Sequence, residues 1–284
     1  MKTLSEYKAL LEDYLNALPI SGAPEKLQNA MRYSLLSGGK RLRGCLLLAA
    51  DDLCGGSLEA ALPFAGALEM IHAYSLIHDD LPAMDNDTLR RGKPTNHVVF
   101  GEAMAILAGD GLLTFAFETM AASSHPKAFA ALGEIARAAG VGGMLGGQVL
   151  DVTNEGNAPE MSLVQCIHAG KTAAMLTSPM TAGLILGGAT QDMIEAGRAY
   201  GHHLGMAFQI VDDLLDLEGD PALMGKTLGK DIQEGKMTWV ACVGADQARR
   251  DAEAHIESAN RAFSPYDREG FFTSLALSTL RRVQ

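Results

Sequence analysis

Two apolar helical stretches, far apart in the chain, each run directly into clustered aspartates. The first, "GALEMIHAYSLIHDDLPAMD", reaches Asp79 and Asp80 and then Pro82, a residue that ends helices. The second, "GMAFQIVDDLLD", carries Asp212 and Asp216, which are four residues apart and share one helical face. Acids that emerge from a buried helix need compensating positive charge, because an unpaired charge in apolar surroundings is costly. We therefore expect two core helices that present carboxylates to one shared cavity.

Apolar residues recur at helical spacing along almost the whole sequence, and alternating, strand-like stretches are scarce. The breaks fall at Gly, Pro and Asn clusters such as "NALPISGAP" and "NEGNAPEMS", and none is long enough for an interdomain linker. This pattern predicts an all-α protein, a single large helical bundle around a central cavity, with residues 1–284 in one domain. The predicted helices cover roughly 3–17, 24–38, 42–53, 58–80, 97–122, 127–153, 161–170, 173–187, 190–217, 237–262 and 266–281.

Composition excludes several classes of partner. The net charge of −11 argues against a nucleic-acid partner, since phosphate backbones need a basic surface. The four cysteines are scattered without CxxC spacing, which favours a reduced, cytoplasmic chain and disfavours structural zinc. The N-terminal stretch carries acids among its apolar residues, unlike a signal peptide. The longest uncharged run, Thr172 to Gln191, contains Pro179 and many small residues, so it favours a buried helix over membrane insertion.

The aspartate clusters contain neither Cys nor His among their acids, and oxygen ligands of this kind suit Mg²⁺. His72 and Asp79 are seven residues apart on one face, and Pro82 lets Asp85 fold back toward Asp79. Protein-bound Mg²⁺ commonly bridges carboxylates to substrate phosphates, so we expect cations nearby that bind phosphate oxygens. The candidates are Arg90 and Arg91, with Lys40, Arg41, Arg43, Lys171, Lys226, Lys230 and Lys236 elsewhere in the chain.

Seven segments, in order along nearly the whole chain, resemble the trans-isoprenyl diphosphate synthases, and most closely those of bacteria that make farnesyl diphosphate. The segments are "GGKRLRG", "DDLPAMD" followed by "LRRGKPT", "GGQVLD", "GKT", "FQIVDDLLD", "GDPALMGKTLGKD" and "EGKMT". The resemblance implies that isopentenyl diphosphate condenses with an allylic diphosphate, first dimethylallyl and then geranyl, to give farnesyl diphosphate. It also implies three Mg²⁺ ions per active site and a homodimer.

Roles for individual residues come from the same resemblance. The metal would be bound by Asp79, Asp80, Asp85, Asp212, Asp213 and Asp216. The allylic diphosphate would be bound by Arg90, Lys171, Thr172, Gln209, Lys226 and Lys236. Isopentenyl diphosphate would be held by Gly39, Lys40, Arg43, His72 and Arg91. Four of these residues would act in catalysis: Lys171, Thr172, Gln209 and Arg90.

Product length should depend on the residues beneath the metal-bound diphosphate. A growing product runs down the helix that carries Asp79, where Ser75 lies four residues back and Tyr74 five back. At about 1.5 Å rise per residue, they lie roughly 6–7.5 Å deeper. In the family an aromatic residue at the Tyr74 position accompanies a fifteen-carbon product, so the resemblance implies farnesyl diphosphate. A ten- or twenty-carbon main product remains the alternative.

Three other functions compete with this interpretation. A class I terpene cyclase also combines an aspartate-rich motif with a helical bundle, but it has no need of "GGKRLR" or of the pair Arg90 and Arg91. An HD-type phosphohydrolase would leave the second cluster unexplained. A non-catalytic subunit of a heteromeric synthase would be expected to lack aspartates that are intact here.

Several residues are open to two interpretations. Gln148 and Asp151 share a helical face and could reach the carboxylates, whereas His78 and His97 are expected to make structural hydrogen bonds. Arg41, like Asp87 and Lys230, fits a solvated surface charge as well as a ligand. Two features depart from the family: Gly44 replaces a proline, which should loosen that turn, and the C-terminus reads "LRRVQ".

Overall fold

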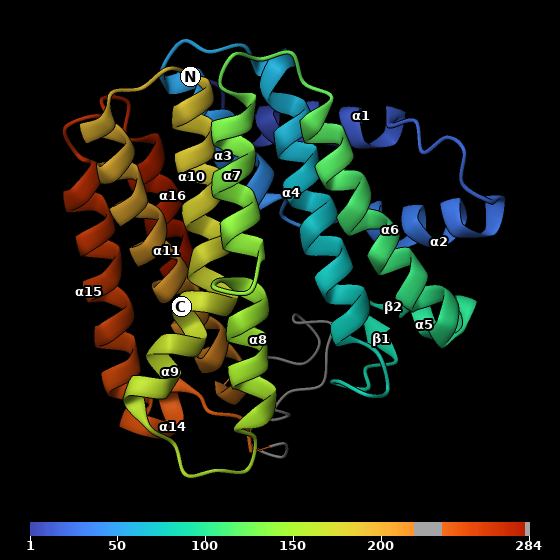
Figure 1. Cartoon of the computed structure of the whole chain (residues 1–284). Helices are drawn as coiled ribbons and strands as arrows, with labels where there is room; N and C mark the ends of the chain where they lie inside the picture. The colour runs from blue at the N-terminus through green and yellow to red at the C-terminus, as the bar shows by residue number, and fades with distance from the viewer. Residues whose placement is uncertain (219–234, 282–284) are drawn as a thin grey trace.

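Helices account for almost all the regular structure of the described chain, which confirms the all-α prediction (Figure 1). The computed structural model describes residues 1–218 and 235–281. The bundle is built from α1 (Leu4–Ala17), α2 (Glu25–Leu35), α3 (Leu42–Leu53), α4 (Leu58–Asp79), α6 (Glu102–Ala121), α7 (Ala128–Ala139), α8 (Met144–Thr153), α10 (Ala174–Leu186), α11 (Gln191–Glu218), α15 (Ala245–Phe263) and α16 (Phe271–Leu280). Shorter helices connect them: α5 (Asn96–Phe100), α9 (Met161–Ile167) and α14 (Trp239–Val243).

The two helices that carry aspartates belong to the core. Neighbouring helices form a continuous series: α6 packs on α4, α4 on α3, α3 on α10, α10 on α11, and α11 on α15. Phe64 and Leu68 of α4 and Leu204 and Ile210 of α11 are fully buried. Both helices run toward the same end of the bundle, where their acids lie (Figure 1). Burial of their apolar residues therefore fixes the direction in which the aspartates leave the core.

Glycines divide three of the predicted helices. The predicted helix 97–122 breaks at Gly101, with φ +87°, and the predicted helix 237–262 breaks at Gly244, with φ +78°. Glycine adopts this left-handed backbone at little cost, and a helix does not continue through it. The predicted helix 127–153 stops at the end of α7 and resumes at α8, across a glycine-rich connection.

The predicted helices 161–170 and 173–187 were expected to be separate, but the helical backbone continues between them. A π-helical segment, η1 (His168–Ala173), joins α9 to α10. Close contact with α8 accompanies this distortion, because a Cβ placed on Gly147 would lie 2.2 Å from the backbone nitrogen of Lys171. The glycine at position 147 therefore lets α8 and η1 approach closely.

A short hairpin follows α4 and was not predicted. Strands β1 (Leu89–Arg90) and β2 (Lys93–Pro94) are antiparallel, with Arg90 opposite Lys93. The two loop residues, Arg91 and Gly92, have φ values of +53° and +74°. Two consecutive positive φ values match a type I′ turn, whose twist suits a two-residue hairpin. The hairpin carries both arginines of "LRRGKPT" back toward the end of α4.

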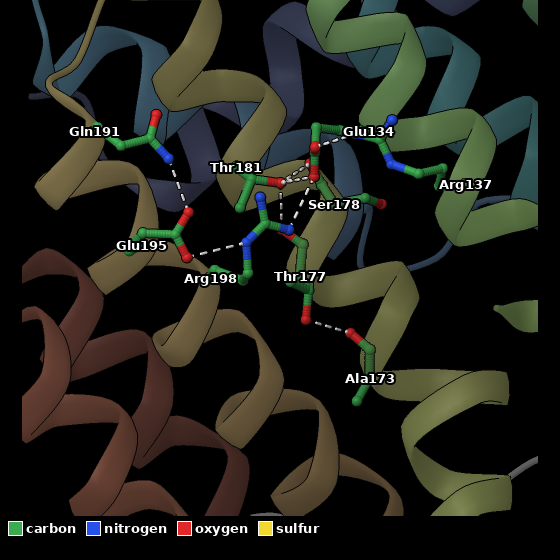
Figure 2. Close-up of polar contacts among 9 residues, drawn as sticks. All are labelled: Glu134, Arg137, Ala173, Thr177, Ser178, Thr181, Gln191, Glu195 and Arg198. Atoms are coloured by element: carbon green, nitrogen blue, oxygen red, sulfur yellow. Dashed lines mark hydrogen bonds and ion pairs between the residues drawn. The ribbon is translucent and has the colours of Figure 1, made fainter. Parts of the chain in front are cut away.

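Polar contacts join α7, α10 and α11 on one side of the bundle (Figure 2). Glu134 of α7 accepts a hydrogen bond from Arg198 of α11 at 2.9 Å and one from Thr181 of α10 at 3.4 Å. Arg137 also donates to Glu134. Burial raises the pKa of the Glu134 carboxyl, but the two arginines outweigh it and hold the pKa below its usual range. This cluster ties α7 to α10 and α11.

Three segments of the described chain are long and apolar enough to cross a membrane by length and composition: α4, α6 and the span 128–153. In α4, 67% of the apolar window is buried against the rest of the protein, so its hydropathy is that of a core helix. The windows of α6 and of 128–153 are 33% and 28% buried.

Candidate active site

The C-terminal end of α4 gathers the first aspartate cluster. The backbone nitrogen of Asp85 donates to the carbonyl of Asp79 at 2.8 Å, so the chain folds back after Pro82 as predicted. Asp80 is 3% exposed and receives Nε and Nη2 of Arg90 at 2.7 and 2.6 Å. Burial raises the pKa of Asp79 to about 6, and the neighbouring carboxylates Asp85 and Asp80 add to this effect. The crowding of these acids makes the cluster a place where bound cations are stabilised.

The π-helical segment faces this cluster. Lys171 Nζ lies 2.6 Å from an oxygen of Asp151, and Gln148 Nε2 donates to Asp79 Oδ1 at 3.0 Å. Burial lowers the pKa of Lys171, but Asp151 and Asp79 outweigh it, so the net pKa is raised and the lysine stays charged. Gln148 and Asp151 therefore do reach the charged groups of the site. A π-helical turn is often found at functional sites, because it redirects side chains that an α-helix would align.

Asp212 and Asp213, the adjacent aspartates of the second cluster, lie in different surroundings. Asp212 lines the main cavity, which has a volume of about 570 Å³, whereas Asp213 is 5% exposed and lines a smaller cavity with Lys171 and Thr172. One oxygen of Asp213 accepts from Gln209 Nε2 at 3.1 Å; the other accepts from the backbone nitrogen of Trp239 at 2.8 Å and lies 3.3 Å from His168 Nε2. Both oxygens of Asp213 are thus engaged by protein groups. Sequence reasoning missed His168 and Trp239, for which the motifs give no signal.

Thr172 and Gln209 form a connected pair between η1 and α11. The Thr172 hydroxyl donates to Gln209 Oε1 at 2.6 Å, and the Gln209 amide nitrogen donates on to Asp213. This chain of hydrogen bonds fixes the amide orientation of Gln209. Lys236 completes this side of the site, because its Nζ lies 3.1 Å from Asp85 and its side chain lines a smaller cavity with Lys171 and Thr172.

A second group of cations lies beside the first cluster. Arg91 donates to the carbonyl of Gly38, and a Cβ on Gly39, whose φ is +123°, would lie 2.6 Å from Arg91 Nη1. Only glycine fits there. Burial lowers the pKa of Arg43, and burial together with Arg43 and Arg91 lowers the pKa of His72 well below its usual range. His72 is therefore neutral at pH 7 beside two guanidinium groups.

Two residues near this group differ from expectation. Arg41 was open to interpretation as a surface charge, but it is 7% exposed and its guanidinium lies 3.5 Å from Glu69. Gly44 donates its backbone N–H to Glu69 at 3.0 Å. A proline at that position has no N–H, so the glycine supplies a hydrogen bond that a proline could not make.

One cavity of about 570 Å³ brings most of the predicted residues together. Its walls come from α3, α4, the hairpin, α8, η1 and α11. Apolar residues that were not predicted, Leu76, Met84, Met144, Leu145 and Phe208, supply much of the lining, as does His78. The predicted residues in the lining are Arg43, His72, Tyr74, Ser75, Asp79, Arg90, Arg91, Lys171, Thr172, Gln209 and Asp212.

Other predicted residues lie outside that lining. Lys40 lines a neighbouring cavity of about 300 Å³, which shares Phe208 with the main one. Asp216 is 3% exposed on α11. Lys226 and Lys230 lie outside the described residues.

The donor set fits Mg²⁺ in the manner that this ion prefers. Within residues 1–218 and 235–281, no three His, Cys, Asp or Glu side chains converge closely enough to enclose an ion. Mg²⁺ is usually bound through one or two carboxylates together with water and substrate phosphates, and does not require a closed cage. Carboxylates at the ends of α4 and α11 that border one cavity satisfy this requirement, and Asp79 and Asp212 would be the nearest to a substrate there.

Comparisons with known proteins agree with this site. The profile of the family described as polyprenyl synthetase matches residues 24–265. The chain is 45% identical over 272 residues to the heterodimeric geranylgeranyl pyrophosphate synthase large subunit 1 of Arabidopsis thaliana, covering 93% of this chain and 73% of the relative. It is 44% identical over 273 residues to the farnesyl diphosphate synthase of Geobacillus stearothermophilus, covering 94% and 92%.

Solved structures give the same picture. An FPP/GFPP synthase from Zymomonas mobilis superposes with a TM-score of 0.85 at 34% identity, covering 98% of this chain and all of the other. A geranyltransferase from Helicobacter pylori, crystallised with magnesium and isoprenyl diphosphate, has a TM-score of 0.84 at 27% identity, with 98% and 95% covered.

Proposed function

The chain belongs to the polyprenyl synthetase family, and we propose on this basis that it joins isopentenyl diphosphate to an allylic diphosphate and makes farnesyl diphosphate as its main product. It is a trans-isoprenyl diphosphate synthase that uses Mg²⁺. The observation that carries the proposal is the single cavity, in which carboxylates from two helices, two groups of cations and an apolar wall meet. We take residues 1–284 to form one polyprenyl synthase domain.

The two groups of cations suit two diphosphates. We assign the allylic diphosphate to the side with Arg90, Lys171 and Lys236, where Asp79, Asp80, Asp85 and Asp212 would hold up to three Mg²⁺ ions. Asp213 and Asp216 belong to the same proposed metal-binding set, with Asp213 supporting it through Gln209. When bound, Mg²⁺ would neutralise charge on the departing diphosphate. The protein's own cations would do the same from fixed positions, which lowers the cost of charge separation.

Isopentenyl diphosphate is assigned to the other group, formed by Arg43, Arg91 and the neutral His72, together with Gly39 and Lys40. The buried Nε of Arg43 has no hydrogen-bond partner within the described chain, so a diphosphate oxygen would satisfy it. Neutral His72 can donate one hydrogen bond without adding to the positive charge. Two diphosphates held in this way would bring the reacting carbons together between them.

Thr172 and Gln209 would lie at the reacting carbon. Their hydroxyl and amide oxygens are held by the hydrogen bonds between them, and oxygen dipoles of fixed direction stabilise a developing allylic cation. The apolar lining from Met84, Met144 and Phe208 would exclude the water that would otherwise trap this cation.

The fifteen-carbon product is proposed from the wall beneath Asp79. Tyr74 is 9% exposed and lines the same cavity as Asp79, with Ser75 beside it. Among the relatives reported above, one makes geranylgeranyl and another farnesyl diphosphate by name, so a twenty-carbon product is the closest alternative.

A homodimer is proposed from the surface of α5, α6, α7 and α8. Exposed apolar side chains recur on these consecutive helices and on the connection between α7 and α8, and exposed apolar surface favours association. The residues are Val98, Val99, Ile106, Leu107, Phe129, Val141, Leu145, Val149 and Val152. We place the enzyme in the cytoplasm, since its cysteines are all free.

The test is a condensation assay with purified protein, Mg²⁺, labelled isopentenyl diphosphate and allylic primers of increasing length. We expect dimethylallyl and geranyl diphosphates to be extended to farnesyl diphosphate, with little extension beyond it. A terpene hydrocarbon formed without isopentenyl diphosphate would instead indicate a cyclase, and the absence of any coupled product would reject the proposed function.

A further inference from the structure

The ring of Tyr74 lies in the wall of the main cavity without a polar anchor. Its hydroxyl makes no hydrogen bond to any residue within 1–218 or 235–281, and the side chain is 9% exposed. A tyrosine whose hydroxyl is not tied can rotate about its side-chain bonds unless its neighbours block the movement. The position of this ring therefore depends on what packs against it.

His78 is the neighbour that packs against Tyr74 along α4. The two residues are four apart, so they share a helical face, and their rings meet edge to face with centroids 5.7 Å apart and an interplanar angle of 79°. This arrangement is the favourable geometry for aromatic pairs. His78 also lines the cavity.

The imidazole of His78 is itself fixed to α6. Its Nε2 lies 3.1 Å from the carbonyl oxygen of Ile106, and because a carbonyl only accepts, Nε2 carries the proton. The same atom lies 3.9 Å from an oxygen of Asp110, on the next turn of α6. The ring thus has one polar attachment that sets its orientation.

Gly109 makes this attachment possible. A Cβ at that position would lie 2.1 Å from Nε2 of His78 and 2.5 Å from Cδ2 of the same ring. The imidazole therefore rests directly on the backbone of α6, where only a glycine leaves room. The His78 ring is thus held between Tyr74 and α6, so it limits the movement of the Tyr74 ring on that side.

We propose that His78 is a positioning residue for product length: seated on Gly109 and bonded to the Ile106 carbonyl, it holds the Tyr74 ring as the floor of the cavity. The inference rests on the proposed function. It adds α6 to the elements that determine where chain growth stops, through a contact that does not touch the reacting carbons. The floor is then the Tyr74 ring, and its resistance to the growing chain depends on the support that His78 gives it.

The experiment compares the products of four proteins from dimethylallyl and isopentenyl diphosphates: wild type, His78→Ala, Tyr74→Ala and the double variant. We expect His78→Ala to raise the ratio of twenty-carbon to fifteen-carbon product about tenfold, equivalent to ~1.4 kcal/mol in the competing barriers. The double variant should give no longer products than Tyr74→Ala alone, because His78 acts through Tyr74. His78→Phe keeps a ring against Tyr74 but lacks the hydrogen bond to the Ile106 carbonyl, so its product ratio should lie between those of wild type and His78→Ala.

Controls separate the inference from a loss of folding and from the proposed function. His125→Ala removes a histidine from the connection between α6 and α7 and should leave the product ratio unchanged; His78→Leu serves if the alanine variant does not fold. An unchanged ratio in a folded His78 variant, or additive effects in the double variant, would overturn the inference while wild-type synthesis continued. A wild type that couples no substrates would remove the proposed function, and this inference with it.

Discussion

At the residue scale, Arg43 is the cation whose contacts most clearly indicate that it binds a ligand. It is half-buried beside His72, burial lowers its pKa, and its buried Nε has no hydrogen-bond partner within the described chain. Arg43→Ala should raise the KM for isopentenyl diphosphate by about 10- to 100-fold, the loss of a charged hydrogen bond of ~1.5–3 kcal/mol. The KM for the allylic substrate should change much less.

Steady-state kinetics with each substrate varied in turn measures this difference. Arg261→Ala, at an exposed position on α15, is the matched control and should leave both constants unchanged. Equal increases in the two KM values would contradict the assignment of Arg43 to isopentenyl diphosphate. Lys40→Ala tests whether a residue that lines the neighbouring cavity also contributes.

Ser75 gives a second prediction at this scale. It lines the cavity on the face of α4 that carries Asp79, and its hydroxyl donates to the carbonyl of His72 at 3.0 Å. Ser75→Phe should fill the space beneath the diphosphate and shift the product toward ten carbons. Chromatography of the products tests this, with Ser75→Ala as the control for the lost hydroxyl. An unchanged distribution would show that this position does not limit chain growth.

The sequence predicts individual residues well where their spacing has geometric meaning. Asp79 and Asp212 line one cavity, as two acid-terminated core helices require. Asp213 shows the limit, because its four-residue spacing from Gln209 places the two on one helical face, but no local pattern predicts its contact with Trp239 in the folded chain. Tertiary packing decides between them.

At the scale of elements, helix breaks were predictable in principle and helix continuity was not. Gly101 and Gly244 adopt positive φ values that end helices, and both are visible in the sequence. The π-helical segment has no such signal in the local sequence. It lies in close contact with Gly147 of α8, and this is a tertiary contact that local patterns do not predict. The hairpin was missed because its strands have two residues each, too few for a periodic pattern to appear.

The hydrogen bonds of Glu134 that join α7, α10 and α11 lead to a prediction about the stability of the fold. Glu134→Gln should lower the free energy of unfolding at pH 7 by about 1 kcal/mol, a modest value because Arg198 is partly exposed. Since the folded pKa of Glu134 lies below its unfolded value of 4.5, its contribution is present above pH 4.5 and is lost as pH falls through the folded pKa. Wild type and variant should therefore converge in stability as the pH falls below 4.5.

Urea unfolding at pH 7 and at pH 3.5 measures both parts of this expectation. Glu195→Gln is the matched control, because Glu195 is exposed and pairs with the same Arg198 at 3.4 Å. A difference between wild type and Glu134→Gln that stayed constant down to pH 3.5 would mean that the lost charge is not the cause.

At the scale of the whole molecule, the apolar surface of α5 to α8 should be an interface between two copies. Leu107 is 52% exposed on α6. Leu107→Lys should weaken association, because a charge buried between two copies would lack a partner. Light scattering should show dimers of the wild type and of Val243→Lys, which alters an exposed apolar residue elsewhere, and monomers of Leu107→Lys. A dimeric Leu107→Lys variant would place the interface on another surface.

The central claim is that carboxylates on α4 and α11 act together, through Mg²⁺, on one allylic diphosphate. The most direct measurement is the rate of condensation of geranyl and isopentenyl diphosphates by Asp79→Asn, Asp212→Asn and the exposed-surface control Asp246→Asn. We expect each cavity variant to lose about 10²- to 10³-fold in kcat, as when one group that stabilises developing charge is removed, while the control retains wild-type rates. Full activity of either cavity variant, or of the wild type in excess chelator, would contradict the claim.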